Sequence, residues 1–166
     1  IENVKLSVIP DNSEKYKMVN FRGYRFLDSI SFLNSGLGKL SENLIEDDPK
    51  NAPRFYKVFS QKGLSEDELV RVTCKGVFPY KWFDSVAKFD HTELPSQEEF
   101  FNDLSGEKCS DEEYDQAKWV WERFGCTTFR DYHDLYLEAD VLLLADVFEA
   151  FRDLCMHQHG LDPAHN

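Results

Sequence analysis

The first thirty residues alternate between apolar and polar side chains, a period of two that is typical of β-strands. The alternation covers residues 4–10 and 16–29, and the turn-forming residues "PDNSEK" interrupt it. Two alternating segments on either side of a short turn favour antiparallel pairing. The pattern therefore predicts a small antiparallel sheet, a hairpin or a meander, near the beginning of the chain.

From Ser29 onward the spacing of apolar residues becomes helical. A break at Ser35–Gly36 divides the apolar stripe and predicts two short helices; the stripe consists of Ile30, Leu33, Leu37, Leu40 and Leu44. Prolines punctuate the middle of the chain, which we expect to be rich in loops around a short helix at 65–72.

Two capping-box patterns mark further helix starts. Ser96 is followed three residues later by Glu99, and Ser110 by Glu113. In such pairs the Ser and Glu side chains satisfy backbone N–H groups at the first turn of a helix. Gly125 is suited to end the helix that begins after Ser110.

Residues 131–155 have the pattern of one long amphipathic helix, and we expect this to be the longest helix of the chain. At about 100° per residue, one apolar stripe comprises Leu137, Val141, Leu144, Phe148, Phe151 and Cys155, with Leu143, Val147 and Leu154 beside it. Leu135 and Leu142 fall outside this stripe. The acidic residues predicted on the opposite, solvated side or its flanks are Asp131, Asp134, Glu138, Asp146, Glu149 and Asp153.

Asp140 is the exception among these carboxylates, because it falls inside the predicted apolar arc together with Tyr136. A carboxylate on a buried face is unfavourable by several kcal/mol unless something pairs with it. The helix alone leaves three explanations open: a buried hydrogen-bond or salt-bridge partner, a covering second domain, or a metal ion.

Composition and charge narrow the class of protein. The chain has 166 residues, of which 42% are hydrophobic, enough for the core of one domain. The spacings described above predict that this is an α+β domain dominated by helices, with strands at about 4–28 and a helical remainder. No apolar run reaches the roughly 20 residues that a bilayer crossing needs, and the four cysteines lack a C-x-x-C pair. We therefore expect an intracellular protein without a membrane segment and with reduced thiols.

The formal net charge of −12 has the wrong sign for a free-standing nucleic-acid binder, since phosphate neutralisation needs Lys and Arg. It predicts feeble binding of single-stranded DNA at physiological salt. An acidic chain is suited instead to holding divalent cations or to docking on a basic neighbour.

Several segments together resemble the exonuclease region of protein-primed family B DNA polymerases, of the kind encoded by large DNA transposons, linear plasmids and related viruses. They are "YRFLDS" followed by leucine-rich helices, "KGVFPY", "LPSQEEFFNDL", "EEYDQAKWVWERFGCTTFRDYHDLYLEADVLLLADVFEAFRDLC" and "HGLDPAHN". The resemblance extends over nearly the whole chain. It implies the latter part of a ribonuclease-H-like exonuclease domain, located in the nucleus or associated with a virus or mobile element.

The element "YLEAD" resembles the third exonuclease motif of that family, Tyr-x-x-x-Asp. The resemblance implies that Asp140 binds catalytic Mg²⁺ or Mn²⁺ and that Tyr136 positions the attacking water. Residues four apart lie on one face of a helix, so Tyr136 can hold a water beside a metal bound to Asp140. The metal explanation for Asp140 is the one that the family implies.

Two further segments match family elements. In "KGVFPY" the resemblance gives Lys75 a supporting role in catalysis and places Tyr80 near the 3′ end of a single strand, whereas the residues alone favour a solvated Lys in a turn. In "FLDSISFL" the resemblance gives Ser29 and Ile30 contacts to single-stranded DNA. The structural alternative is that Asp28 or Ser29 caps the following helix.

Other elements of the family are not recognisable in this sequence. The Asp-x-Glu motif and the Asp of the second motif are expected before this chain, and the polymerase motifs after it. Two-metal hydrolysis needs carboxylates from several elements, so we expect these residues alone to be inactive. Two functions stay open: part of a proofreading exonuclease that acts with the remaining polymerase segments, or a non-catalytic binding module derived from such an enzyme.

Overall fold

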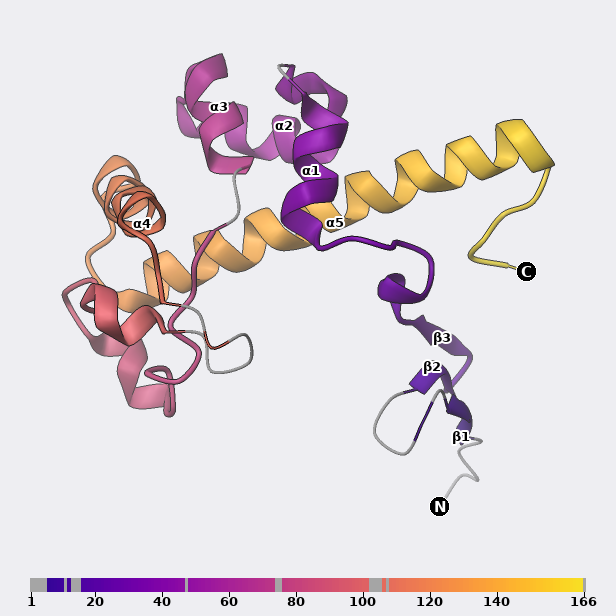
Figure 1. The fold of residues 1–166 in the computed structure, drawn as a ribbon, viewed down its shortest axis with the longest axis horizontal. Helices are drawn as coiled ribbons and strands as arrows, with labels where there is room; N and C mark the ends of the chain where they lie inside the picture. Colours follow the sequence, from indigo (N-terminus) through magenta and orange to yellow (C-terminus); the bar gives the residue numbers. More distant parts are fainter. Residues whose placement is uncertain are drawn as a thin grey trace. The chain divides into compact units, whose positions relative to one another are not determined.

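The computed structural model describes residues 6–10, 12, 16–46, 48–73, 76–101, 106 and 108–165 (Figure 1). The fold is mixed α+β, with a three-stranded antiparallel sheet and five α-helices in the described part. The elements are β1 (Leu6–Pro10), β2 (Tyr16–Phe21), β3 (Tyr24–Leu27), α1 (Leu37–Ile45), α2 (Pro53–Phe59), α3 (Glu66–Thr73), α4 (Asp111–Arg123) and α5 (Phe129–His159), with short 3₁₀ turns between some of them.

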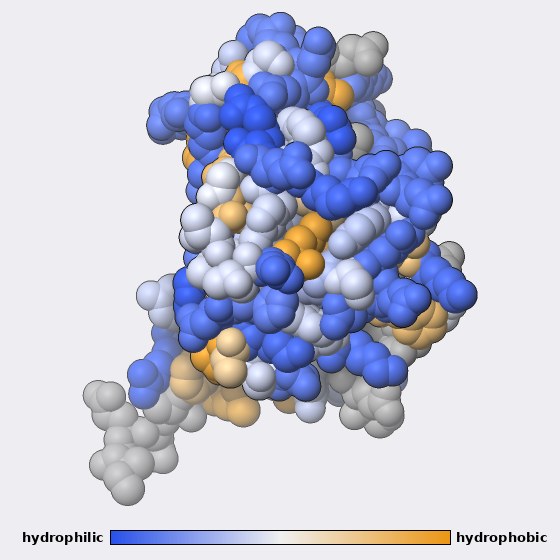
Figure 2. Space-filling view, turned by 90° about the vertical axis from the view of Figure 1, so that its left-hand side faces the viewer, coloured by the Kyte–Doolittle hydropathy of each residue, from blue (hydrophilic) through white to orange (hydrophobic). Residues whose placement is uncertain are grey.

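The chain divides into two compact units, which are described separately. Unit 1 comprises residues 1–36 and 148–166, and unit 2 comprises residues 37–147. No helix among the described residues is long and apolar enough to cross a membrane. Figure 2 shows hydrophilic side chains over most of one face, with smaller apolar patches between them.

Unit 1 contains the predicted sheet, which is a meander in the order β1–β2–β3. The segment at 16–29 forms two strands because a two-residue turn with positive φ at Arg22 (51°) and Gly23 (83°) separates them, the backbone that tight hairpins require. Within the same unit, the ring of Phe32 lies 6.0 Å from that of Phe148. Arg152 binds Asp162 and Glu149, which ties the C-terminal residues to the end of α5.

Unit 2 has two apolar clusters along the first half of α5. In Figure 1, α1, α2 and α3 lie along the middle of α5, and α4 lies nearer its beginning. The first cluster contains Ile45, Ala52, Phe55, Phe59, Leu69, Ala139 and Leu143. The second contains Phe100, Cys109, Ala117, Cys126, Phe129 and Tyr132. Residues of α5 belong to both clusters: Ala139 and Leu143 to the first, and Phe129 and Tyr132 to the second.

The helix starts were predicted well from capping residues. Ser110 and Glu113 form the expected capping box of α4, and Gly125 follows that helix with a φ of 62°. Ser96 and Glu99 also form a capping box, but the element is a single 3₁₀ turn at Gln97–Phe100. The helix α2 was not predicted, because the prolines around it indicated loops; Pro53 is in fact its first residue, a position that tolerates proline.

The length of α5 confirms the predicted long helix, but its predicted apolar face is buried only in part: Leu143 and Val147 are buried, whereas other members of the stripe are exposed. Leu137, Val141 and Leu144 are 50%, 57% and 37% exposed. Leu135 and Leu142, which fell outside the predicted stripe, pack against the apolar clusters instead. The run "VLLLA" presents apolar residues on several sides of the helix, so spacing alone did not determine which side is buried.

Asp146 was predicted on the solvated side of α5, and this is wrong, because its side chain is fully buried. Its carboxylate accepts hydrogen bonds from the backbone N–H groups of Arg54 (3.0 Å) and Phe55 (2.9 Å), at the first turn of α2. Arg54 Nη1 donates a further bond of 3.0 Å. Ala52, which precedes α2, supplies no side-chain cap, so Asp146 caps α2 through space.

We expect Asp146→Ala to lower the stability of the chain by about 3 kcal/mol, or its melting temperature by roughly 10 °C. The substitution leaves two buried N–H groups of α2 without an acceptor. Arg54→Met is expected to cost less than about 1 kcal/mol, since the Arg54 side chain is 47% exposed and the backbone bonds survive. Thermal unfolding followed by circular dichroism measures both, with the exposed Asp153→Ala as control. Equal effects of Asp146→Ala and Asp153→Ala would contradict the assignment.

Candidate functional site

Asp140 lies on the flank of α5, between its buried face and its exposed leucines, and is half-buried. Burial raises the pKa of the Asp140 carboxyl above its ordinary value, and a hydrogen bond with Tyr136 acts in the opposite direction. The raised pKa means that burial removes more stabilisation from the carboxylate than Tyr136 restores. Among the residues that the structure describes, Tyr136 therefore compensates the burial of Asp140 only in part.

Tyr136 connects Asp140 to a second tyrosine. Its hydroxyl oxygen lies 3.1 Å from the hydroxyl oxygen of Tyr80. Burial, followed by hydrogen bonding with Tyr80, raises the pKa of the Tyr136 phenol well above its ordinary value, so the phenol is neutral and carries one proton. If Tyr136 donates this proton to Asp140, Tyr80 must be the donor to Tyr136. The two hydroxyls and the carboxylate then form one continuous chain.

The backbone at Gly76 fixes the position of the Tyr136 ring. A Cβ atom at Gly76 would lie 3.0 and 3.1 Å from two carbon atoms of that ring, closer than ordinary van der Waals contact. Phe78 covers the ring from another side, with 5.2 Å between the ring centroids. Position 76 thus needs a glycine, because a residue with a Cβ would prevent the backbone from lying this close to the Tyr136 ring.

The other predicted site residues are placed as follows. Tyr80 is 65% exposed, so its ring is open to a ligand while its hydroxyl meets Tyr136. Lys75 lies outside the described residues. Ser29 is half-buried and Ile30 is 66% exposed, but both belong to unit 1, whereas Tyr80, Tyr136 and Asp140 belong to unit 2. The structure thus brings three of the six predicted residues together. We call these three, Tyr80, Tyr136 and Asp140, the Tyr136 cluster.

The structural alternative at Ser29 is present in part. The Asp28 side chain accepts a hydrogen bond of 3.1 Å from the backbone N–H of Ile30 and caps the short 3₁₀ turn at Ser29–Ser31. Asp28, not Ser29, therefore has the capping role. The Ser29 hydroxyl is not needed for that cap.

The described residues do not form a complete metal site around Asp140. Over the described part of the chain, no group of three or more His, Cys, Asp or Glu side chains is arranged to hold a metal ion. Mg²⁺ and two-metal catalytic sites use several oxygen ligands. These residues alone therefore do not fit the metal pair that the family resemblance implies, and Asp140 fits it as one ligand among several.

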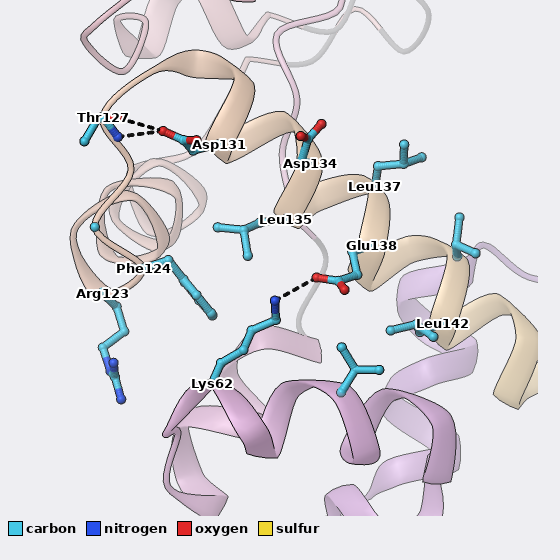
Figure 3. A pocket seen from close by; sticks show the side chains of 13 residues that line it. Lys62, Arg123, Phe124, Thr127, Asp131, Asp134, Leu135, Leu137, Glu138 and Leu142 are labelled. Carbon is cyan, nitrogen blue, oxygen red and sulfur yellow. Dashed lines mark hydrogen bonds and ion pairs between the residues drawn. The ribbon is translucent and has the colours of Figure 1, made fainter.

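A groove of about 970 Å³ lies beside this cluster in unit 2, but neither Tyr136 nor Asp140 lines it (Figure 3). Figure 3 shows Phe124 and Leu135 pointing into the groove, and the ion pair of Lys62 and Glu138 across it, at 2.9 Å. Asp131 accepts bonds from the backbone N–H groups of Thr127 and Thr128 at the start of α5. The charged groups of the groove thus have structural partners, and it is not the predicted site.

Sequence reasoning missed Asp146 and Gly76. The signal for Asp146 was indirect: the sequence "NAPRF" begins a helix with no Ser, Thr, Asp or Asn directly before its proline, so an acceptor had to come from elsewhere. Gly76 lies in the quoted segment "KGVFPY", but a close approach between distant segments leaves no local pattern.

Comparison of the chain with models of protein families, with curated proteins and with solved structures gave no match.

Asp140→Asn is expected to raise the melting temperature at neutral pH by a few degrees. A raised folded-state pKa means that the carboxyl contributes stability below its unfolded pKa, and that this contribution is lost as the pH rises through the folded value. Asparagine keeps an oxygen that accepts from Tyr136 and carries no charge. The advantage of the variant should shrink as the pH falls toward 3.8, the ordinary value for Asp. Thermal unfolding at several pH values measures it; a variant less stable than wild type at neutral pH would contradict the prediction.

Gly76→Ala should destabilise the chain by about 1–3 kcal/mol, because the added methyl group overlaps the Tyr136 ring. Gly36→Ala is the matched control, since nothing lies within 4 Å of a Cβ at Gly36 and its φ is not positive. Chemical denaturation compares the two variants. Equal stability of both would show that Tyr136 is not held by the Gly76 backbone.

Proposed function

We propose that this chain is part of the 3′–5′ exonuclease region of a protein-primed family B DNA polymerase, with a ribonuclease-H-like architecture for the complete domain. The proposal places it in the nucleus or with a virus or mobile element. The observation that carries the proposal is the coupling of Tyr136 to Asp140. The Tyr-x-x-x-Asp spacing of the family motif coincides with a half-buried carboxylate whose pKa is raised by burial, as expected of a site that awaits a positive partner.

In this proposal Tyr136 and Tyr80 have positioning roles, and the Asp140 carboxylate binds a metal ion. Asp140 would contribute one ligand to Mg²⁺ or Mn²⁺, which would supply charge stabilisation at the scissile phosphate. Tyr136, held by Gly76, would keep a hydroxyl at a fixed position next to Asp140. The exposed ring of Tyr80 would stack against the terminal base.

Three further residues have roles from the resemblance alone. Lys75 would neutralise charge that develops on the phosphate during cleavage. Ser29 and Ile30 would contact the single-stranded 3′ end. The other metal-binding carboxylates would come from an Asp-x-Glu segment and a second Asp motif, which are not recognised in this sequence.

A competing proposal is a non-catalytic binding module of the same ancestry. The single carboxylate of the Tyr136 cluster and the lack of a three-ligand group among the described residues favour it. The two proposals predict different outcomes when the other carboxylates are supplied.

The test is a nuclease assay on a 3′-labelled single strand with magnesium or manganese. We expect the 166-residue chain alone to be silent, and a fusion to the Asp-x-Glu-bearing exonuclease segment of a protein-primed polymerase to remove 3′ nucleotides. In the fusion, Asp140→Asn should reduce the rate at least about 100-fold. Asp153→Asn, an exposed carboxylate on the same helix, should leave it unchanged.

Two outcomes would contradict the exonuclease proposal. A fusion that folds but stays silent would favour the binding module. A fusion whose rate is unaffected by Asp140→Asn would show that Asp140 is not a ligand. Activity of the chain alone that is lost in Asp140→Asn would instead show that it already holds a sufficient set of carboxylates.

A further inference from the structure

One face of the sheet in unit 1 is made mostly of aliphatic and aromatic side chains. The register pairs Leu6 with Phe21 and Val8 with Val19 between β1 and β2, and Val19 with Phe26 and Phe21 with Tyr24 between β2 and β3. Directly opposed residues point to the same side of a sheet. We call the face formed by Leu6, Val8, Val19, Phe21, Tyr24 and Phe26 the aromatic face.

The aromatic face is exposed. Phe21, Tyr24 and Phe26 are 40%, 72% and 58% exposed, although an apolar sheet face is normally covered. The C-terminal residues of unit 1 lie toward the other face, since Arg25, which alternates with Tyr24 and Phe26, donates a hydrogen bond of 3.2 Å to the carbonyl of Ala164. The C-terminal residues of unit 1 therefore do not cover the aromatic face.

Charge distinguishes this sheet from the rest of the chain. Residues 6–27 contain four Lys or Arg and two Asp or Glu, a net charge of +2, whereas the whole chain carries −12. This part of the chain is thus less acidic than the rest, and Arg22, in the turn between β2 and β3, lies beside the aromatic face, whereas Arg25 belongs to the opposite face. A protein whose overall field repels phosphate has here a local region that attracts it.

Arg22 places one of these charges beside the aromatic rings. Its guanidinium carbon lies 5.4 Å from the centroid of the Phe21 ring. Arg22 has a φ of 51°, a left-handed conformation for which this turn type favours Asn or Gly. Strained positions of this kind are enriched at functional sites, which agrees with a role for the arginine side chain itself.

We propose that the aromatic face binds single-stranded nucleic acid, with bases stacked on Phe21, Tyr24 and Phe26 and the phosphate backbone near Arg22. Exposed aromatic rings on a sheet, flanked by cations, are the arrangement that holds unpaired bases without regard to sequence. The positive charge beside the rings favours nucleic acid over a purely apolar partner, which would not need it. This site belongs to unit 1, whereas Tyr136 and Asp140 belong to unit 2, and it does not depend on exonuclease activity.

The test measures anisotropy of labelled deoxythymidine and uridine oligomers of about 12 nucleotides with the full 166-residue chain, in chelator and at about 20 mM salt. The binding expected at low salt should weaken about tenfold or more in Phe26→Leu, because leucine keeps apolar volume but has no aromatic ring. Ile9→Ala, on the opposite face and 48% exposed, should bind as wild type. The two oligomers show whether DNA or RNA is preferred.

Arg22→Asn separates binding from folding. Asparagine tolerates the left-handed conformation, so the hairpin should become more stable. Oligomer binding should nevertheless weaken, and its logarithmic salt dependence should fall by about 0.7 for one lost phosphate contact. The chelator excludes metal-dependent binding at the proposed exonuclease site from this measurement.

Three results would overturn the proposal. The first is no binding at low salt by a chain that circular dichroism shows to be folded. The second is wild-type binding by Phe26→Leu. The third is self-association without oligomer binding, retained in Phe26→Leu and lost in Phe26→Glu, which would assign the face to contacts between copies of the chain.

Discussion

The arrangement of unit 2 depends on the hydrogen bonds that the Asp146 carboxylate accepts from α2. The carboxylate joins α5 to the first turn of α2 through two backbone N–H groups and the Arg54 guanidinium. This bond fixes α2 so that Phe55 and Phe59, stacked 4.5 Å apart, pack beside Ala139 and Leu143 of α5. A buried charge is tolerated there because a helix N-terminus and an arginine compensate it.

The two inward carboxylates of α5 therefore have opposite energetic roles. Asp146 is saturated with donors and stabilises the fold. Among the described residues, the partner of Asp140 is the Tyr136 hydroxyl, and burial keeps the pKa of Asp140 raised, so its ionised form is held at a cost to stability. Natural proteins accept such costs at functional positions. This contrast is the physical basis for proposing Asp140, and not Asp146, as a ligand.

Local signals in the sequence predicted the elements more reliably than their packing. The meander, the α4 capping box and the long helix follow from periodicity and capping residues, which act within a few positions. The buried side of α5 was predicted only in part and the burial of Asp146 was not predicted, because both depend on which distant segment packs against the helix. Of the site, the spacing of Tyr136 and Asp140 was visible in the sequence. Their link to Tyr80 and Gly76 needed the tertiary structure.

Tyr136 and Asp140 form one coupled, half-buried unit. The most direct measurement is a carbon-detected NMR titration of the Asp140 carboxyl in the wild-type chain and in Tyr136→Phe. We expect the wild-type pKa of Asp140 to lie above the ordinary value for Asp, and to rise further in Tyr136→Phe, because the phenol that stabilises the carboxylate is removed. An ordinary pKa that does not change in Tyr136→Phe would contradict this coupling.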